Sequence, residues 1–305
     1  LKADIYSLFL SFLDIGFLQL HAIDEYFFHG SLLNIYDGLV NLDPKVFFRT
    51  GFYSYGFLFF FVNFLFTWPF IVFNDPSFVI FIPKMITSFF ALVSLSYVYK
   101  FARLYTYRVT SLILVLFVAL MPGFWSNALW FHPDWMMTAF LLGSIYFLAK
   151  DKNIFSINFW IAVVLYGLSL ASKFQAITFL PILLLYIVPK EIFWSGFAFL
   201  KKKFILLIKF CVIIVSIYVV SNPYLLHPLG LRVFLRSMND NLISNATNHG
   251  IAGTVSVGVK LKDAIVLPYI HYIFFIILLF VAIYYVYKYF RQKEQTIFYI
   301  LSINF

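Results

Sequence analysis

The segment HAIDEYFFHG, residues 21–30, places two adjacent carboxylates and two histidines at the end of an apolar run. Asp24 and Glu25 could act as a general acid or base. With His21 and His29 they could also hold a divalent cation, because imidazole and carboxylate both suit such ions. His29 follows Glu25 by four residues, the spacing of neighbours on a helix, but no HExxH-type spacing is present. An isolated acidic pair is usually a solvated helix end, so the surrounding elements decide its meaning.

A second acid, Asp134, lies in the segment FWSNALWFHPDW, between two apolar runs. His132 precedes it by two residues. The pair could cooperate through proton transfer or by hydrogen bonding to a substrate. The alternative for His132 is a loop histidine with a structural hydrogen bond.

The composition is that of a membrane protein. The chain is 63% hydrophobic and 11% charged, with a mean hydropathy of +0.92, whereas soluble domains carry about 25% charged residues. The net charge of +9 comes from short Lys and Arg clusters between apolar runs, which the positive-inside rule explains, so we expect no nucleic-acid partner. The single cysteine, Cys211, excludes an internal disulfide and is expected in the core.

Apolar runs recur at the roughly 17 to 20 residues needed to cross about 30 Å of hydrocarbon, and the alternation typical of barrels is missing. The runs are 1–20, 55–73, 80–99, 109–125, 134–150, 155–172, 174–189, 204–221 and 265–288, with a tenth beginning near 296. The sequence therefore predicts an all-α polytopic bundle forming a single transmembrane domain over 1–305. We expect it to be part of a longer protein.

Basic clusters should lie in the cytoplasm. They comprise Lys100, Arg103 and Arg108; Lys150 and Lys152; Lys190 and Lys201 to Lys203; and Lys288, Arg291 and Lys293. External loops are then expected at about 21–54, 125–134 and 221–263. Asp24 and Asp134 share the outer face only if one intervening run fails to cross, and we expect 55–73 to be that interfacial or re-entrant segment.

Four segments in order carry a family resemblance. They are DEYFFHGSLLNIYDGLVNLDPKVFFRTGFYSYG, the stretch from PKMITSFF to FHPDWMMTAF, LYGLSLASKFQAITFLPILLLY and SNPYLLHP, which together span most of residues 15–250. This pattern resembles the GT-C glycosyltransferases, in the branch of protein O-mannosyltransferases and lipid A aminoarabinose transferases. The resemblance implies a GT-C type bundle with short amphipathic helices in the first external loop.

The resemblance also implies catalytic roles. Asp24 would be the base or the group that orients the acceptor, with Glu25 as its support and Asp134 as a second acid facing the cavity. The phosphate of the donor is a good leaving group, so the chemistry needs a base for the acceptor hydroxyl and cationic support for the phosphate. A single displacement would invert the anomeric carbon.

Substrate contacts are expected from the outer face. Arg49 and Lys173 are the candidate cations for the phosphate, with plain interfacial anchoring as the alternative for each. Tyr53, Tyr55 and His132 are expected to contact substrate. Two further cations that could bind the phosphate instead are Arg232 and Arg236.

The expected partners are a polyprenyl-phosphate sugar donor, a lipid, glycan or protein acceptor, and membrane lipids. No cofactor or metal is expected, with a divalent cation as the alternative. The residue bias favours a bacterial inner membrane with the site facing outside. The alternative functions are a flippase or other transporter of polyprenyl-linked oligosaccharides, and an O-antigen polymerase-like protein.

Overall fold

The computed structural model describes residues 23–151, 154–187, 197–247 and 280 of the chain. Within these ranges the ordered elements are α-helices and short 3-10 helices, with one isolated β-bridge between Tyr55 and Lys173. The all-α prediction is confirmed for the described residues. The predicted runs 1–20 and 265–288, the start of a tenth near 296, and residues His21, Lys152, Lys190, Lys288, Arg291 and Lys293 lie outside them.

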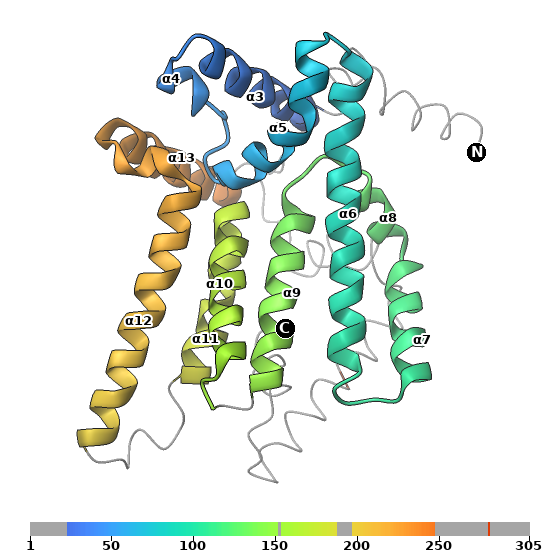
Figure 1. Cartoon of the computed structure of the whole chain (residues 1–305), viewed down its shortest axis with the longest axis vertical. Coiled ribbons are helices and arrows are strands. Elements are labelled where there is room, and N and C mark those ends of the chain that lie inside the picture. The colour runs from blue at the N-terminus through green and yellow to red at the C-terminus, as the bar shows by residue number, and fades with distance from the viewer. Residues whose placement is uncertain (1–22, 152–153, 188–196, 248–279, 281–305) are drawn as a thin grey trace.

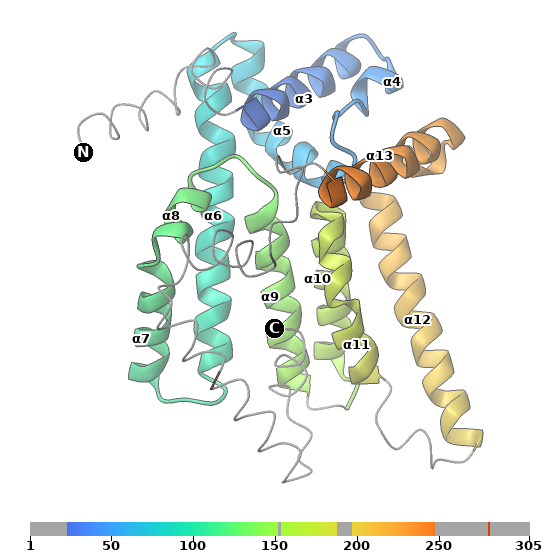
Figure 2. The same cartoon turned by 180° about the vertical axis from the view of Figure 1, so that it is seen from behind.

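The helices form a bundle and a cap (Figures 1 and 2). The bundle contains α6 (Pro76–Ala102), α7 (Arg108–Ala119), α9 (Asp134–Asp151), α10 (Ile157–Ser172), α11 (Leu180–Ile187) and α12 (Phe197–Ser221). The cap contains α3 (Ile23–Val40), α4 (Pro44–Phe47), α5 (Phe57–Val72) and α13 (Pro228–Thr247), gathered at the end where α6 begins and α12 ends. Three short elements make connections: α8 (Pro122–Ala128), η1 (Phe174–Phe179) and η3 (Pro223–Leu226).

Two of the described helices are long and apolar enough to cross a membrane, namely α6 and the Phe204–Ser221 part of α12. Large apolar side chains on α7 and α12, such as Ile113 and Val215, are exposed on the outside of the bundle. Exposed apolar surface of this extent is stable in lipid rather than in water. The described helices are therefore those of a membrane protein.

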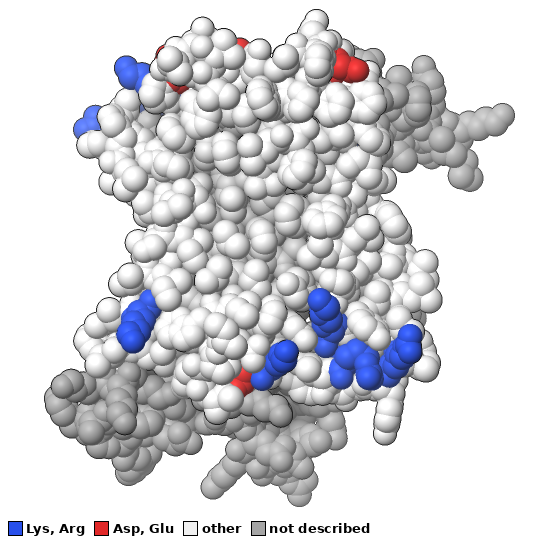
Figure 3. All heavy atoms as spheres, viewed as in Figure 1, with Lys and Arg blue, Asp and Glu red and all other residues white. Residues whose placement is uncertain are grey.

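Charge is divided between the two ends of the bundle (Figure 3). Lys and Arg gather around the end away from the cap, while the acidic atoms in view lie mainly at the cap. The chain direction explains this, because Lys100 and Lys150 stand in the last turns of α6 and α9, and Arg108 begins α7. This is the separation of charge that the basic clusters predict.

Two predicted spans are wrong as continuous helices. Residues 109–125 divide into α7 and α8, because Pro122 starts a new helix after a break at Leu120 and Met121. The 12 residues of α7 reach only about 18 Å, less than the hydrocarbon thickness. Residues 174–189 begin as the 3-10 helix η1 before α11 starts at Leu180.

The course of α5 keeps it at the cap. Next to its first residue, the Gly56 N–H donates to Ser172 O at 3.0 Å, at the cap end of α10. Near its other end, Phe70 stacks on Phe78 in the first turn of α6, with ring centroids 4.9 Å apart. Residues 55–73 therefore start and finish at the same end of the bundle.

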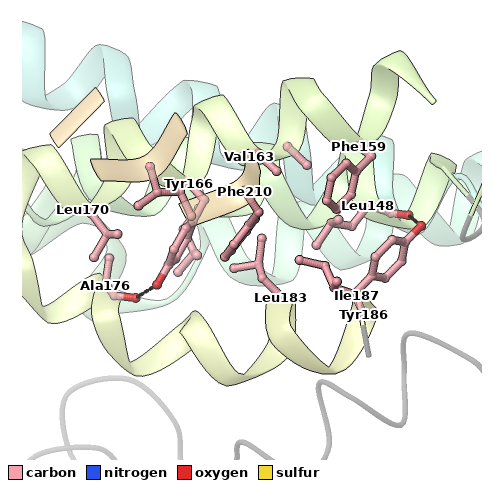
Figure 4. Packing of buried hydrophobic residues seen from close by; sticks show 13 residues of the cluster. Leu148, Phe159, Val163, Tyr166, Leu170, Ala176, Leu183, Tyr186, Ile187 and Phe210 are labelled. Carbon is pink, nitrogen blue, oxygen red and sulfur yellow. Dashed lines mark hydrogen bonds between the residues drawn. The ribbon is translucent and has the colours of Figure 1, made fainter. Parts of the chain in front are cut away.

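Two apolar cores support this arrangement. One lies between α9, α10, α11 and α12 and includes hydrogen-bonded tyrosines, with Tyr166 donating to Ala176 O and Tyr186 to Leu148 O (Figure 4). The other lies in the cap and is aromatic, centred on Phe28, whose ring meets Phe60 and Phe131 edge-on at 5.8 Å. Cys211 is exposed on α12, so the expectation that it lies in the core is wrong; α12 turns that side outward.

Candidate active site

Asp24 and Glu25 in the first turn of α3 have opposite environments. Asp24 is exposed, whereas the Glu25 residue is 1% exposed. Successive residues on a helix point about 100° apart, so adjacent carboxylates cannot share one face. The Asp24 carboxylate is therefore exposed, and the neighbouring Glu25 carboxylate is buried in the protein.

Glu25 joins three separate elements. Its carboxylate pairs with Lys84 Nζ of α6 at 3.0 Å through Oε1 and 2.7 Å through Oε2. The backbone N–H of Phe131, in the segment between α8 and α9, donates to Oε1 at 2.8 Å. Burial raises the pKa of Glu25, and the Lys84 ammonium opposes that rise. Glu25 thus fixes the first turn of α3, and with it Asp24, against the bundle.

Asp134 stands at the start of α9, where a carboxylate also suits the positive end of the helix dipole. It forms an ion pair with Lys173 Nζ, and His132 Nδ1 lies 2.9 Å from its Oδ2. Pro133 favours an extended backbone at His132 and a helix start after it, which brings the imidazole back onto the carboxylate. The structure therefore brings together three of the predicted site residues.

Lys173 reaches this position through the junction of α10 and η1. Its backbone is extended, at φ −155° and ψ 123°, and pairs with Tyr55 in the isolated β-bridge. The Phe174 N–H donates to Ser54 O at 3.1 Å. Lys173 Nζ lies 5.1 Å from the centroid of the Tyr55 ring, within the range of a cation–π contact.

Tyr55 links the two acids of the site. Its ring meets the His132 ring edge-on, with centroids 5.2 Å apart. Burial, followed by the negative charges of Asp134 and Asp24, raises the pKa of Tyr55 to about 12. Asp24 in the first turn of α3 and Asp134 in the first turn of α9 lie at the same end of the bundle, because Glu25 accepts the Phe131 N–H just before α9.

Gly56 lies at a close contact between the cap and the bundle. A Cβ atom at this residue would lie 1.6 Å from Ala171 O, so no larger side chain fits. Next to it, Asn222 Oδ1 accepts the buried Phe57 N–H at 2.7 Å and so caps the start of α5. This junction holds Tyr55 beside Lys173.

Arg49 and Tyr53 lie to one side of this cluster. Tyr53 meets the Tyr224 ring edge-on at 5.3 Å. Burial raises the pKa of Tyr53, and the Arg49 charge opposes that rise, so the Arg49 guanidinium is close to this phenol. Arg232 and Arg236 are exposed on α13, where Arg236 Nε lies 3.8 Å from Asp240. Among the cations expected to bind phosphate, Lys173 is the one paired with Asp134.

The predicted alternative of a metal site finds no support in the part of the chain that the structure describes. No group of three or more metal-binding side chains occurs there. The Glu25 carboxylate is occupied by Lys84 and the Phe131 N–H. His29 is fully buried against the Phe131 ring, and neither of its nitrogens has a hydrogen-bond partner.

A family model described as dolichyl-phosphate-mannose-protein mannosyltransferase matches residues 60–221, which is more than half of the chain. The chain belongs to this family. It is thus a mannosyltransferase-like membrane glycosyltransferase that uses a lipid-linked sugar donor, and the predicted resemblance is confirmed. No curated protein and no solved structure matches the chain.

The part matched by the mannosyltransferase family contains Lys84, His132, Asp134 and Lys173, and begins after Asp24 and Glu25. Sequence reasoning missed Lys84 because it lies in an apolar run. The signal was available, since a charged residue within such a run needs a buried partner. Asn222 was also missed, and a contact between residues 165 positions apart leaves no local sequence signal.

Proposed function

We propose that this mannosyltransferase-family protein moves a sugar from a polyprenyl-phosphate donor to an acceptor hydroxyl, with inversion, at the cap end of the bundle. Asp24 accepts the hydroxyl proton, and the acceptor oxygen attacks the anomeric carbon. The bond between that carbon and the phosphate oxygen breaks, and its electron pair leaves with the phosphate. Lys173 or Arg49 stabilises the negative charge on the departing phosphate.

The single observation that carries this proposal is that Glu25, the neighbour of Asp24, accepts the Phe131 N–H at 2.8 Å, which holds the start of α3 against the segment that carries His132 and Asp134. It supports a shared site in which Asp24 is open to solvent and Asp134 is already paired with a cation and an imidazole. An open carboxylate is free to receive a proton, whereas the paired acid is suited to orienting Lys173 and His132. Glu25 supports Asp24 through its contacts with Lys84 and Phe131.

The orientation of the protein is part of the proposal. More of the Lys and Arg in view lie at the end away from the cap than at the cap, and the positive-inside rule favours the cytoplasm for that end (Figure 3). The cap and its site then face outward, across a bacterial inner membrane. The acceptor, a lipid, glycan or protein, arrives from the aqueous side, and the donor enters from the lipid between helices.

The test uses the complete protein with a panel of polyprenyl-phosphate sugars, and measures release of polyprenyl phosphate. Asp24→Asn should lower turnover by about 100-fold or more while donor binding remains, because a general base contributes about 10²- to 10⁴-fold. Asp37→Asn, on the exposed side of the same helix, is the matched control and should leave turnover unchanged. Release from no donor, or full activity of Asp24→Asn, would overturn the proposal.

A further inference from the structure

Trp130 is a large aromatic residue beside the site to which the proposed chemistry gives no role. It lies between α8 and α9, and its ring stacks on His132 with centroids 4.5 Å apart and planes at 18°. Among the described residues it is not part of the buried aromatic and aliphatic clusters. Trp135, five residues further on, behaves differently, since it packs against Phe124 in such a cluster.

The stack joins Trp130 to the acids of the site. His132 is buried, with one ring nitrogen at 2.9 Å from Asp134 Oδ2 and its ring edge-on to Tyr55. Trp130 is only half-buried, so part of its surface remains accessible. The buried His132 ring thus lies between two partly accessible groups, the Trp130 indole and the Asp134 carboxylate. His132 in turn contacts Phe28 in the cap core, so the stack holds the indole in a defined orientation beside the site.

A partly exposed indole is suited to a sugar ring. The faces of aromatic rings carry partial negative charge. One face of a pyranose presents C–H bonds with partial positive charge, and its hydroxyl groups project around the edge. Such a face can lie flat on Trp130 while the hydroxyl groups remain free for hydrogen bonds from neighbouring side chains or water.

We propose that Trp130 is the platform for the sugar of the donor, stacking on its apolar face and so directing the anomeric carbon toward Asp24 and Asp134. This inference rests on the proposed function and names the part of the donor that the site recognises. Trp130 then distinguishes the sugar-bearing donor from the polyprenyl phosphate that is released. It contributes to binding and orientation, and no proton passes through it.

The experiment compares two lipids in the complete protein. Trp130→Ala should raise the donor KM by about tenfold, in keeping with the strength of an aromatic contact. The Ki of sugar-free polyprenyl phosphate as a competitive inhibitor should stay the same, because that lipid has no sugar to stack. Trp130→Phe should restore most of the donor affinity, since a smaller aromatic face remains. The acceptor KM should not change.

Trp125→Ala is the matched control, because Trp125 is an exposed tryptophan on nearby α8 whose ring meets Phe124 edge-on. It should leave the donor KM unchanged. An unchanged donor KM in Trp130→Ala would overturn the inference while the proposed function stands. An equal rise in donor KM and inhibitor Ki, or a rise in acceptor KM alone, would also overturn it. If the unaltered protein releases polyprenyl phosphate from no donor, the proposed function fails and this inference fails with it.

Discussion

The two ends of α9 each carry an aspartate, and their surroundings differ in every respect. Asp151, at the last residue, is 0% exposed, whereas the Asp134 side chain, at the first, is 41% exposed. Asp151 lies at the end of the bundle away from the cap, and Asp134 lies at the cap end. The same helix thus offers a direct comparison between two carboxylates with different purposes.

Asp151 is satisfied by neutral donors. Its oxygens accept from the Phe155 N–H at 2.9 Å, the Ser156 N–H at 2.7 Å, the Ser156 hydroxyl at 2.5 Å and the Tyr186 hydroxyl at 2.8 Å. These donors come from the turn before α10 and from α11, so the carboxylate joins three helices. It has no lone pair turned to solvent, and such a group is structural.

Asp134 is held instead by groups that carry or can carry positive charge, Lys173 and His132. Part of its carboxylate remains exposed. The charges of Asp134 and Asp24 both raise the pKa of Tyr55. The difference teaches that burial and hydrogen bonding alone do not mark the site. In the proposed site the acid is partly exposed and paired with groups whose positive charge could bind a substrate phosphate.

The largest predicted effect is on turnover, which should fall when Asp134 is replaced and stay unchanged when Asp151 is replaced. Asp134→Asn should lower turnover by about 100-fold or more, because Lys173 and His132 lose the charge that orients them. Asp151→Asn should lower the free energy of unfolding by about 2 kcal/mol, since the amide nitrogen must face hydrogen-bond donors. It should leave turnover per folded molecule unchanged. Release of polyprenyl phosphate and the apparent melting temperature in detergent measure the two effects.

The reverse pattern would break the comparison. If Asp151→Asn abolished turnover in protein that remained folded, or Asp134→Asn only lowered the melting temperature, then partial exposure and a cationic partner would not identify the site carboxylate.

Glu25 combines features of both aspartates, because it is sealed like Asp151 and has a cationic partner like Asp134. Lys84→Met leaves a buried carboxylate without its ion-pair partner and should cost about 3–5 kcal/mol of stability. The double variant Glu25→Gln with Lys84→Met should recover part of this loss, because the glutamine oxygen can still accept the Phe131 N–H. Chemical denaturation of Glu25→Gln, Lys84→Met and the double variant in detergent measures the coupling energy between the two side chains. Losses that simply add would show that the pair acts independently.

The sequence predicted the location of the candidate acids better than it predicted their contacts, and their catalytic roles stay a prediction. Asp24, Asp134, His132 and Lys173 could be assigned to one face because the direction of the helices follows from the basic clusters. Which acid of the pair Asp24 and Glu25 is open depends on which side of α3 packs against Lys84 and Phe131, and these partners are 59 and 106 residues away in the sequence. Pro122 is a helix-start signal in the sequence, but the apolar run 109–125 is long enough to span a membrane and was therefore predicted as one helix.

The effect that appears only at acid pH concerns His29, one turn after Glu25 on α3. Burial, followed by the nearby Lys84 charge, lowers the pKa of His29 to about 3 from 6.5. Below pH 6.5 the unfolded chain therefore binds a proton that the folded chain refuses, so stability falls as pH falls toward 3. The loss from this residue is about 1 kcal/mol for each pH unit within that window.

His29→Phe should remove this part of the acid sensitivity and should not reduce stability at pH 7, because it replaces two unpartnered nitrogens that face the Phe131 ring. Melting temperatures of both proteins between pH 7 and pH 4 give the measurement. Parallel curves would show that His29 does have a proton-accepting partner in the folded protein. The expected result is that the two melting temperatures agree near pH 7 and separate as the pH falls. His29 would then be a residue that supports the fold, as Asp151 does, although it lies in the same helix as Asp24.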